Sequence, residues 1–216
     1  MGRILDGHVV LLGDSIFDNA AYTGREPDVI QHLRSILPSG WKASLLAVDG
    51  SVTSDLSSQI REVPADASHL VVSIGGNDAL MNSDLLELPV DSTAEALELF
   101  HQRMAAFESN YRPAIEEVLE LGRPTALCTI YNGNLPDPEH ARHARIALTM
   151  FNDVILRAAF ELSLPAIELR LVCNEPADYA NPIEPSGRGG RKIAMAVARA
   201  VGALETARAG SWVLAG

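Results

Sequence analysis

Five short apolar segments alternate with longer amphipathic segments, and this alternation restricts the fold more than any other feature of the chain. The apolar segments span residues 9–12, 42–48, 69–74, 125–130 and 166–169. Helical spacing or a capping residue marks 28–37, 54–61, 92–121, 138–162 and 186–207. Strands and helices that alternate in this way are typical of a parallel sheet with helices on both faces.

We therefore predict an α/β fold with three layers, α/β/α, around a five-stranded parallel sheet. Right-handed crossovers leave few topologies, and we expect the flavodoxin-like order 2-1-3-4-5, with a ligand crevice between the first and third strands. No internal repeat, low-complexity stretch or linker divides the chain, so we predict a single domain over residues 1–216. Pro113 predicts a kink or a break in the helix at 92–121.

Charge and composition exclude several classes of partner. The formal net charge is −11, from 28 acidic and 17 basic residues, and such a surface repels the phosphate backbone of nucleic acids. No uncharged apolar stretch approaches the ~18 residues of a membrane span, and the first residues lack the apolar core of a signal peptide. We expect a cytoplasmic protein with no nucleic-acid or membrane partner, and no pattern indicates its oligomeric state.

Three of the predicted strands end in residues suited to acyl transfer. The first runs into Gly13-Asp14-Ser15, the second into Gly50, and the third into Gly75-Gly76-Asn77-Asp78. The carboxyl ends of parallel strands meet at one edge of the sheet. There Ser15 offers a nucleophilic hydroxyl, while the N–H groups of Ser15 and Gly50 and the Asn77 amide offer donors for an oxyanion.

The order of these motifs resembles that of the SGNH (GDSL) hydrolase superfamily, whose fold is also a three-layer α/β/α sandwich. The resemblance implies a serine ester hydrolase with Ser15 as nucleophile, and with the Ser15 N–H, Gly50 N–H and Asn77 side chain as oxyanion hole. It implies a small-molecule substrate, an ester of a small acyl group or an acylated carbohydrate. We expect Asp14 and Asp78 to order their loops through hydrogen bonds.

The last motif departs from the family pattern. The family carries Asp-x-x-His-Pro before its final helix, with the histidine as general base and the aspartate orienting it. In this chain Asn181 stands at the aspartate position and Glu184 at the histidine position, and no histidine follows His143. The usual pair that activates the serine is therefore absent.

Several interpretations of this departure remain open. A solvated glutamate, with a pKa of about 4.3, is a weaker base than an imidazole at about 6.5. Glu184 is either an unusual base whose pKa is raised by burial or a structural acid near a helix N-terminus. Alternatively, His140 or His143 takes the role of base, or the site binds an acyl or sugar ligand without hydrolysing it. No acid or cysteine cluster accompanies the two histidines, so we predict neither a metal nor a cofactor.

Overall fold

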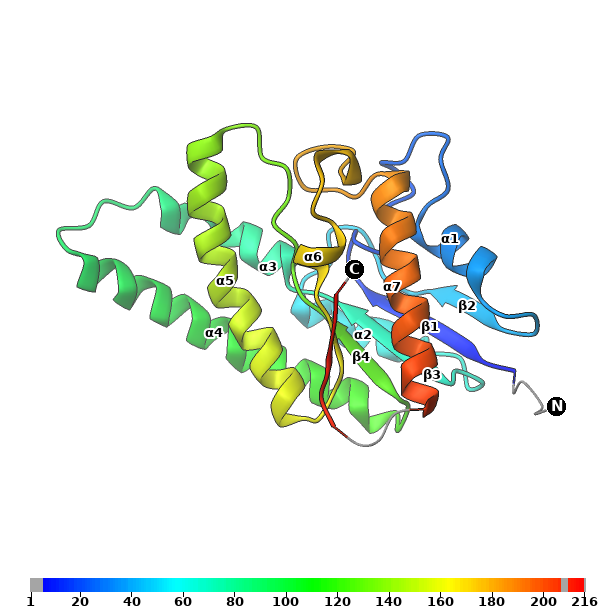
Figure 1. Ribbon diagram of the computed structural model, residues 1–216. Helices are drawn as coiled ribbons and strands as arrows, with labels where there is room; N and C mark the ends of the chain where they lie inside the picture. Colours follow the sequence, from blue (N-terminus) through cyan, green and yellow to red (C-terminus); the bar gives the residue numbers. More distant parts are fainter. Residues whose placement is uncertain (1–5, 207–209, 216) are drawn as a thin grey trace.

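The computed structural model describes residues 6–206 and 210–215, and it has the predicted three-layer architecture (Figure 1). The strands are β1 (His8–Gly13), β2 (Lys42–Leu45), β3 (His69–Ser73), β4 (Thr125–Cys128), β5 (Ala166–Ile167) and β6 (Val213–Leu214). They pair in parallel in the order β2-β1-β3-β4-β5-β6. The predicted order of the first five strands is confirmed, and the short strand β6 adds an edge that the sequence pattern did not reveal.

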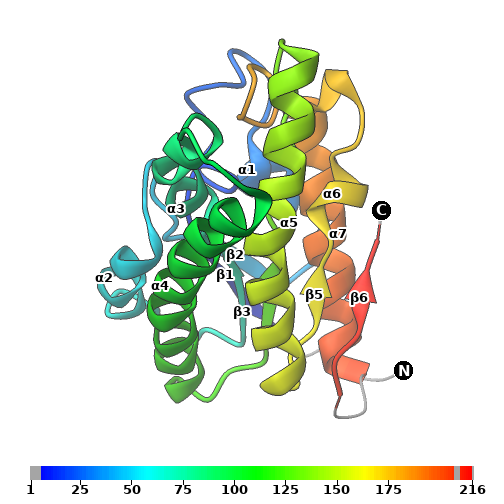
Figure 2. The same cartoon turned by 90° about the vertical axis from the view of Figure 1, so that its left-hand side faces the viewer.

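Helices cover both faces of this sheet. They are α1 (Val29–Ile36), α2 (Leu56–Ile60), α3 (Gly76–Met81), α4 (Thr93–Glu120), α5 (Pro138–Glu161), α6 (Leu169–Val172) and α7 (Gly187–Thr206), with 3-10 turns η1 (Thr53–Asp55), η2 (Ser83–Leu86) and η3 (Pro176–Asp178). In Figure 2, α2, α4 and α5 lie on one side of the sheet, and α6 and α7 on the other. No described helix is long and apolar enough to cross a bilayer.

Strand β1 lies inside the sheet and contributes side chains to two hydrophobic cores, one on each face of the sheet. Val9 and Leu11 pack with α1 and α7, whereas Val10 and Leu12 pack with α2, α4 and α5. All four side chains are fully buried, because successive side chains of a strand point to opposite faces and both faces are covered. This explains why the segment is continuously apolar instead of alternating.

Several element boundaries differ from the predictions. Helix α4 continues through Pro113 instead of breaking there. The cost of a proline inside a helix, about 3 kcal/mol, is opposed by the burial of Phe107 and Tyr111 before it and of Ile115 and Val118 after it. Helix α3, which begins directly after the third strand's glycines, was not predicted because six residues carry little periodicity.

The remaining differences concern strand and helix ends. Strand β2 ends at Leu45, although the amide of Val48 still donates to Gly13 O at 3.1 Å. Strand β5 ends at Ile167 because Leu169 already begins α6. Helix α7 begins at Gly187, and Ala207, its predicted last residue, lies outside the described residues.

Candidate active site

Ser15 lies at the carboxyl edge of the sheet, just after strand β1, and the turn that places it there requires glycine at position 13. Gly13 has φ 131°, and a Cβ placed on it would lie 1.8 Å from Ser73 O. Beyond it, the Asp14 amide donates to Ser73 O at 3.1 Å, and the amides of Phe17 and Asp18 donate to Asp14 O at 3.1 Å. The backbone therefore turns sharply at Ser15, as the glycine-containing motif predicts.

The side chain that contacts the Ser15 hydroxyl is Glu184, 169 residues away in the sequence. Ser15 Oγ donates to Glu184 Oε1 at 3.1 Å, and both residues are buried, with 8% and 6% of their surfaces exposed. Oε2 of Glu184 is also buried and has no hydrogen-bond partner within the described part of the chain. Burial raises the pKa of the Glu184 carboxyl above its ordinary value, and the Ser15 hydrogen bond opposes this shift.

Asn181 shapes the loop that presents Glu184. Its Oδ1 accepts hydrogen bonds from the amides of Ile183 and Glu184, at 2.9 and 2.8 Å, which is a local turn typical of asparagine and aspartate. The Ala180 amide closes the turn by donating to Glu184 O at 2.9 Å. Asn181 therefore acts on the backbone of the loop, and its side chain does not reach the Glu184 carboxylate.

Neighbouring segments hold this loop from two sides. The hydroxyl of Tyr131, just beyond β4, donates to Ile183 O, and the Asn134 amide donates to Pro182 O at 2.8 Å. On the other side, the buried Asn19 donates to Pro185 O at 3.1 Å while its Oδ1 accepts from the first amide of α1. The position of the Glu184 carboxylate is thus fixed by loops from both halves of the chain.

The cap of helix α7 is a different residue. Ser186 Oγ accepts from the Gly189 amide at 3.2 Å, and Ser186 O accepts from the Gly190 amide at 2.7 Å, which is how a serine N-cap acts. No hydrogen bond of the described chain joins the Glu184 carboxylate to an amide of α7. The geometry therefore pairs Glu184 with the serine and leaves the capping to Ser186.

Gly50 and Asn77, the two predicted oxyanion donors other than Ser15, are linked through Ser51. Asn77 is the second residue of α3, and its Nδ2 donates to Ser51 O at 2.8 Å, which uses one of its two amide hydrogens. Gly50, with φ 81°, occupies the turn just before Ser51. Among the described residues, the N–H groups of Ser15 and Gly50 donate to no acceptor, so these backbone donors are not used by the fold.

Gln59 on α2 organises this edge and was not singled out from the sequence. Its Oε1 accepts from the Gly13 amide at 2.7 Å, and its Nε2 donates to Gly13 O at 2.8 Å and to Ser51 Oγ at 3.3 Å. Gln59 therefore binds both backbone groups of Gly13, the residue that precedes the turn carrying Asp14 and Ser15. A glutamine within a five-residue helix gives no signal in the sequence that distinguishes it from a surface side chain.

Asp14 and Asp78 both accept loop hydrogen bonds. Asp14 Oδ1 accepts from the Ile16 amide at 3.1 Å, and Asp78 Oδ2 accepts from the amide and hydroxyl of Thr53, both at 3.0 Å. Burial, together with the Glu184 and Asp78 carboxyl groups, raises the pKa of Asp14 to about 7. Burial also raises the pKa of Asp78.

The two histidines considered as alternative bases lie on α5. His140 lines the same cavity as Ser15 and Glu184, whereas His143 lines an adjoining cavity. Both are exposed, and neither bonds to Ser15 in the described structure. No group of three or more His, Cys, Asp or Glu side chains within the described residues is arranged to hold a metal ion.

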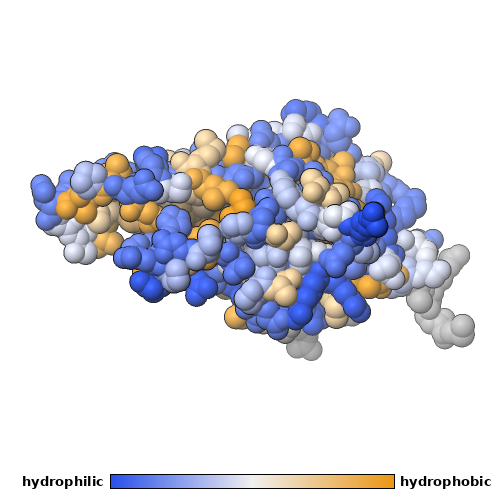
Figure 3. All heavy atoms as spheres, turned by 90° about the horizontal axis from the view of Figure 1, so that it is seen from above, coloured by the Kyte–Doolittle hydropathy of each residue, from blue (hydrophilic) through white to orange (hydrophobic). Residues whose placement is uncertain are grey.

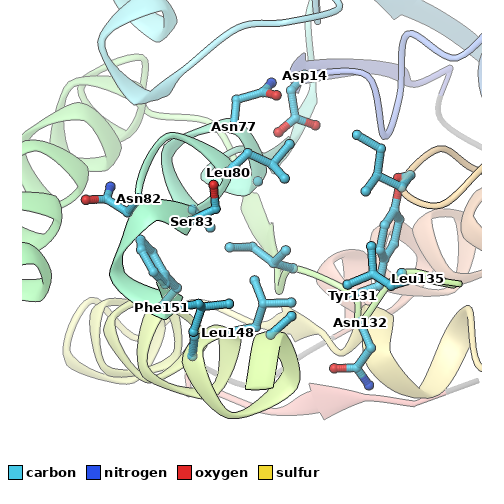
Figure 4. A pocket seen from close by; sticks show the side chains of 18 of the residues that line it. Asp14, Asn77, Leu80, Asn82, Ser83, Tyr131, Asn132, Leu135, Leu148 and Phe151 are labelled. Carbon is cyan, nitrogen blue, oxygen red and sulfur yellow. The ribbon is translucent and has the colours of Figure 1, made fainter. Parts of the chain in front are cut away.

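A cavity of ≈ 140 Å³ opens beside the Ser15 hydroxyl. In Figure 4, Asp14 and Asn77 occupy one end, and apolar side chains, among them Leu80, Leu148 and Phe151, surround the rest. The cavity therefore places a nucleophile-type hydroxyl, a buried carboxylate and an amide donor against a mostly apolar space.

The profile of the GDSL-like Lipase/Acylhydrolase family matches residues 11–192, which includes the end of β1, the glycine turns and Glu184. The chain belongs to this family. Its members are hydrolases, and the resemblance found in the three strand-end motifs is confirmed. No curated protein sequence matches the chain significantly.

Solved structures of several esterases and lipases share the fold. An extracellular lipase from Streptomyces rimosus has 14% identity and a TM-score of 0.65, over 90% of this chain and 99% of that one. A phospholipase A1 from Streptomyces albidoflavus has 16% identity and a TM-score of 0.67, with the same coverage. A catalytic variant of an acetylxylan esterase from Geobacillus stearothermophilus has 19% identity and a TM-score of 0.63, over 93% and 97%.

Proposed function

We propose that this protein is a serine ester hydrolase in which Glu184 takes the place of the usual histidine base. The observation that carries the proposal is the 3.1 Å hydrogen bond from Ser15 Oγ to the buried Glu184 carboxylate. A general base must lie within hydrogen-bond reach of the proton it removes, about 2.6–3.2 Å. Burial raises the pKa of the Glu184 carboxyl above its ordinary value, which strengthens it as a base.

In the first half-reaction, Ser15 Oγ bonds to the ester carbonyl carbon and its proton passes to Glu184 Oε1. The carbonyl oxygen becomes an oxyanion, which accepts hydrogen bonds from the Ser15 N–H, the Gly50 N–H and the free amide hydrogen of Asn77. The bond to the alcohol oxygen then breaks, and that oxygen takes the proton from Glu184. An acyl group remains on Ser15.

In the second half-reaction, Glu184 removes a proton from a water molecule that attacks the acyl carbon. The tetrahedral intermediate collapses, the carboxylic acid leaves, and Ser15 Oγ regains its proton from Glu184. Asp14 and Asp78 take no part in proton transfer. They hold the β1 turn and the α3 segment through the Ile16 and Thr53 bonds.

A small-molecule ester is the substrate class. The similar solved structures include an acetylxylan esterase and lipases, which supports either an acetylated carbohydrate, as the sequence suggests, or a lipid ester. The alternative function is a ligand-binding protein on the same scaffold. The absence of the Asp and His pair favours it, because loss of the usual base removes most of the rate in serine hydrolases.

Acylation of Ser15 separates these two functions. Hydrolysis of p-nitrophenyl acetate and labelling by a fluorophosphonate, located by mass spectrometry, are expected for the wild-type protein. Ser15→Ala should abolish both, whereas Glu184→Gln should lower kcat about 10²–10⁴-fold, the usual contribution of a general base. Ser35→Ala, which changes an exposed serine on α1, is the matched control.

Three results would contradict the proposal. Wild-type labelling that persists in Ser15→Ala would place the nucleophile elsewhere. Full activity in Glu184→Gln, with activity lost in His140→Ala, would assign the base to α5. Absence of any acylated Ser15 in the folded wild-type protein would leave the ligand-binding alternative.

A further inference from the structure

A second apolar cavity adjoins the cavity beside Ser15. The second one has a volume of ≈ 270 Å³ and shares four lining residues with the first: Leu85 and Leu86 of η2, Phe100 of α4 and Ala147 of α5. Because these four residues line both spaces, the two cavities adjoin, and together they extend from the reacting groups along η2 to the first turns of α4 and α5. We call the two cavities together the α4–α5 groove.

The walls of the α4–α5 groove change character along its length. At the Ser15 end, Asp14, Asn77 and Glu184 supply polar groups. In the distal cavity, His143 is the one residue with a polar side chain among those that line it, and the others are apolar: Leu85, Leu86, Leu88, Val90, Ala96, Leu99, Phe100, Ile146 and Ala147. A ligand that fits this profile has one polar, reactive end and an uncharged hydrocarbon tail.

Much of the apolar surface around the groove is exposed to water. Ile146 is 63% exposed, Leu80 46% and Val90 41%, and all three line the groove. Figure 3 shows apolar side chains gathered around a hollow at this end of the molecule. A contiguous exposed apolar surface of this kind marks a site that something apolar covers.

We propose that the α4–α5 groove binds the acyl chain of the substrate, and that the protein prefers esters of medium-length, unbranched fatty acids to acetate esters. The ester carbonyl lies at Ser15, and the methylene chain passes Leu86 and Phe100 toward Ile146. The inference rests on the proposed function for the cleavage of the ester, whereas binding of the chain rests on the groove alone. An acetyl group would leave the whole distal cavity unfilled.

The chain-length dependence of hydrolysis tests this inference. For p-nitrophenyl acetate, butyrate, octanoate and decanoate, we expect kcat/KM to rise by up to about fourfold per added CH₂, which corresponds to ~0.8 kcal/mol of burial. Ala147→Phe, at the wall common to both cavities, should remove this rise. Ile146→Lys, at an exposed position that tolerates charge, tests the same point if the first variant folds poorly.

Matched controls use the same helix. Thr149 of α5 is exposed and lines neither cavity, so Thr149→Phe and Thr149→Lys should keep the wild-type dependence on chain length. Hydrolysis of acetate with no rise toward decanoate in the wild-type protein would overturn the inference and leave the proposed function intact.

Binding of free decanoate distinguishes the remaining outcomes, whether or not the protein hydrolyses esters. Calorimetry should detect decanoate binding to wild type and to Ser15→Ala, weakened at least tenfold in Ala147→Phe or Ile146→Lys. If no ester is cleaved but decanoate binds in this pattern, the groove assignment stands and the hydrolase proposal fails. If decanoate does not bind, and sedimentation shows a dimer that Ile146→Lys dissociates, the groove is an interface between copies and the inference is wrong.

Discussion

Ser15 shares its surroundings with two buried carboxyl groups, and their ionisation governs what its hydroxyl can do. Glu184 accepts a hydrogen bond from the hydroxyl, and Asp14, whose pKa is raised to about 7, lies close enough to be influenced by the Glu184 charge. Two neighbouring carboxylates in a desolvated site do not ionise independently. We expect Glu184 to ionise first, because its carboxylate keeps the Ser15 hydrogen bond.

Ionisation of Glu184 before Asp14 predicts a bell-shaped dependence of kcat/KM on pH. Activity should rise as pH increases through the raised pKa of Glu184, because only the ionised carboxylate accepts a proton. It should fall as pH passes about 7, where Asp14 ionises beside the developing oxyanion. Asp14→Asn should remove the alkaline limb and keep the acid limb. An alkaline limb unchanged in Asp14→Asn would show that another group causes it.

Restoring the family pair offers a second prediction at this position. In the double variant Asn181→Asp/Glu184→His, Asp can accept the same two loop amides that Asn181 accepts, and the imidazole replaces the carboxylate beside Ser15. We expect the acid limb of kcat/KM to move toward about 6.5, the ordinary pKa of histidine. The single variant Glu184→His serves as the control for the orienting aspartate. A limb that does not move would contradict the assignment of the base.

Ser15, Gly50 and Asn77 could be named as candidates from the sequence because each follows a strand that its apolar pattern reveals, whereas Glu184 was named from its position in the last family motif. Ser15 and Asn77 line one cavity, as their strand ends predict, while Gly50 lies in the turn tied to Asn77 through Ser51. The partner of Ser15 could not be settled in this way. Whether Glu184, His140 or His143 faces the hydroxyl depends on loops whose conformation is set by tertiary contacts, such as those of Tyr131 and Asn19.

Among the secondary-structure elements, the five-residue helix α2 positions two loops of the candidate site. It carries Gln59, whose amide satisfies the N–H and C=O of Gly13 at the end of β1 and also contacts Ser51. The Gln59 side chain therefore links Gly13, which precedes the Ser15 turn, to Ser51, whose carbonyl oxygen accepts from the Asn77 amide. We regard Gln59 as a positioning residue for both.

Replacing Gln59 should affect stability and rate together. Gln59→Leu leaves the buried amide of Gly13 unpaired, whereas Gly13 O keeps the hydrogen bond from the Val48 amide. One unsatisfied group costs about 1–3 kcal/mol, and the change should lower kcat more than it changes KM. Gln59→Glu keeps the acceptor for the Gly13 amide, but it sets a buried carboxyl oxygen against Gly13 O, so it should also be less stable than wild type. Urea denaturation and steady-state kinetics measure the two effects. A destabilised variant with unchanged kcat would reduce Gln59 to a structural role.

The long helices followed the sequence pattern, whereas two of the short elements, α3 and β6, were not predicted. Helices α4 and α5 have 28 and 24 residues, enough for several repeats of the apolar spacing. Strand β6 has two residues, and its pairing depends on the hydrogen bonds from Ala166 N to Trp212 O and from Glu168 N to Leu214 O. In Figure 2, β6 lies beside β5. A two-residue strand of this kind forms because it pairs with a neighbouring strand, and not because of a local sequence preference.

Over the whole molecule, a strongly acidic chain carries an apolar groove. The net charge of −11 predicts that an ester presented in anionic micelles is hydrolysed more slowly than the same ester in zwitterionic micelles at about 0.01 M salt, where the Debye length is about 30 Å. The difference should vanish near 1 M salt. Initial rates on a decanoyl ester measure it, with an ester dissolved as monomer as the control. Equal rates on both micelles at low salt would contradict the prediction.

The hydrogen bond between Ser15 and Glu184 joins the first strand to the segment that precedes the last helix. During synthesis, the serine leaves the ribosome long before its acceptor exists. A nascent chain that ends before residue 184 can form β1 and the turn after it. The Ser15 hydroxyl of such a chain lacks the Glu184 carboxylate as its hydrogen-bond acceptor. Under the proposed function, the chain gains esterase activity only after α7 and the preceding loop have docked, so the appearance of that activity would time the end of folding.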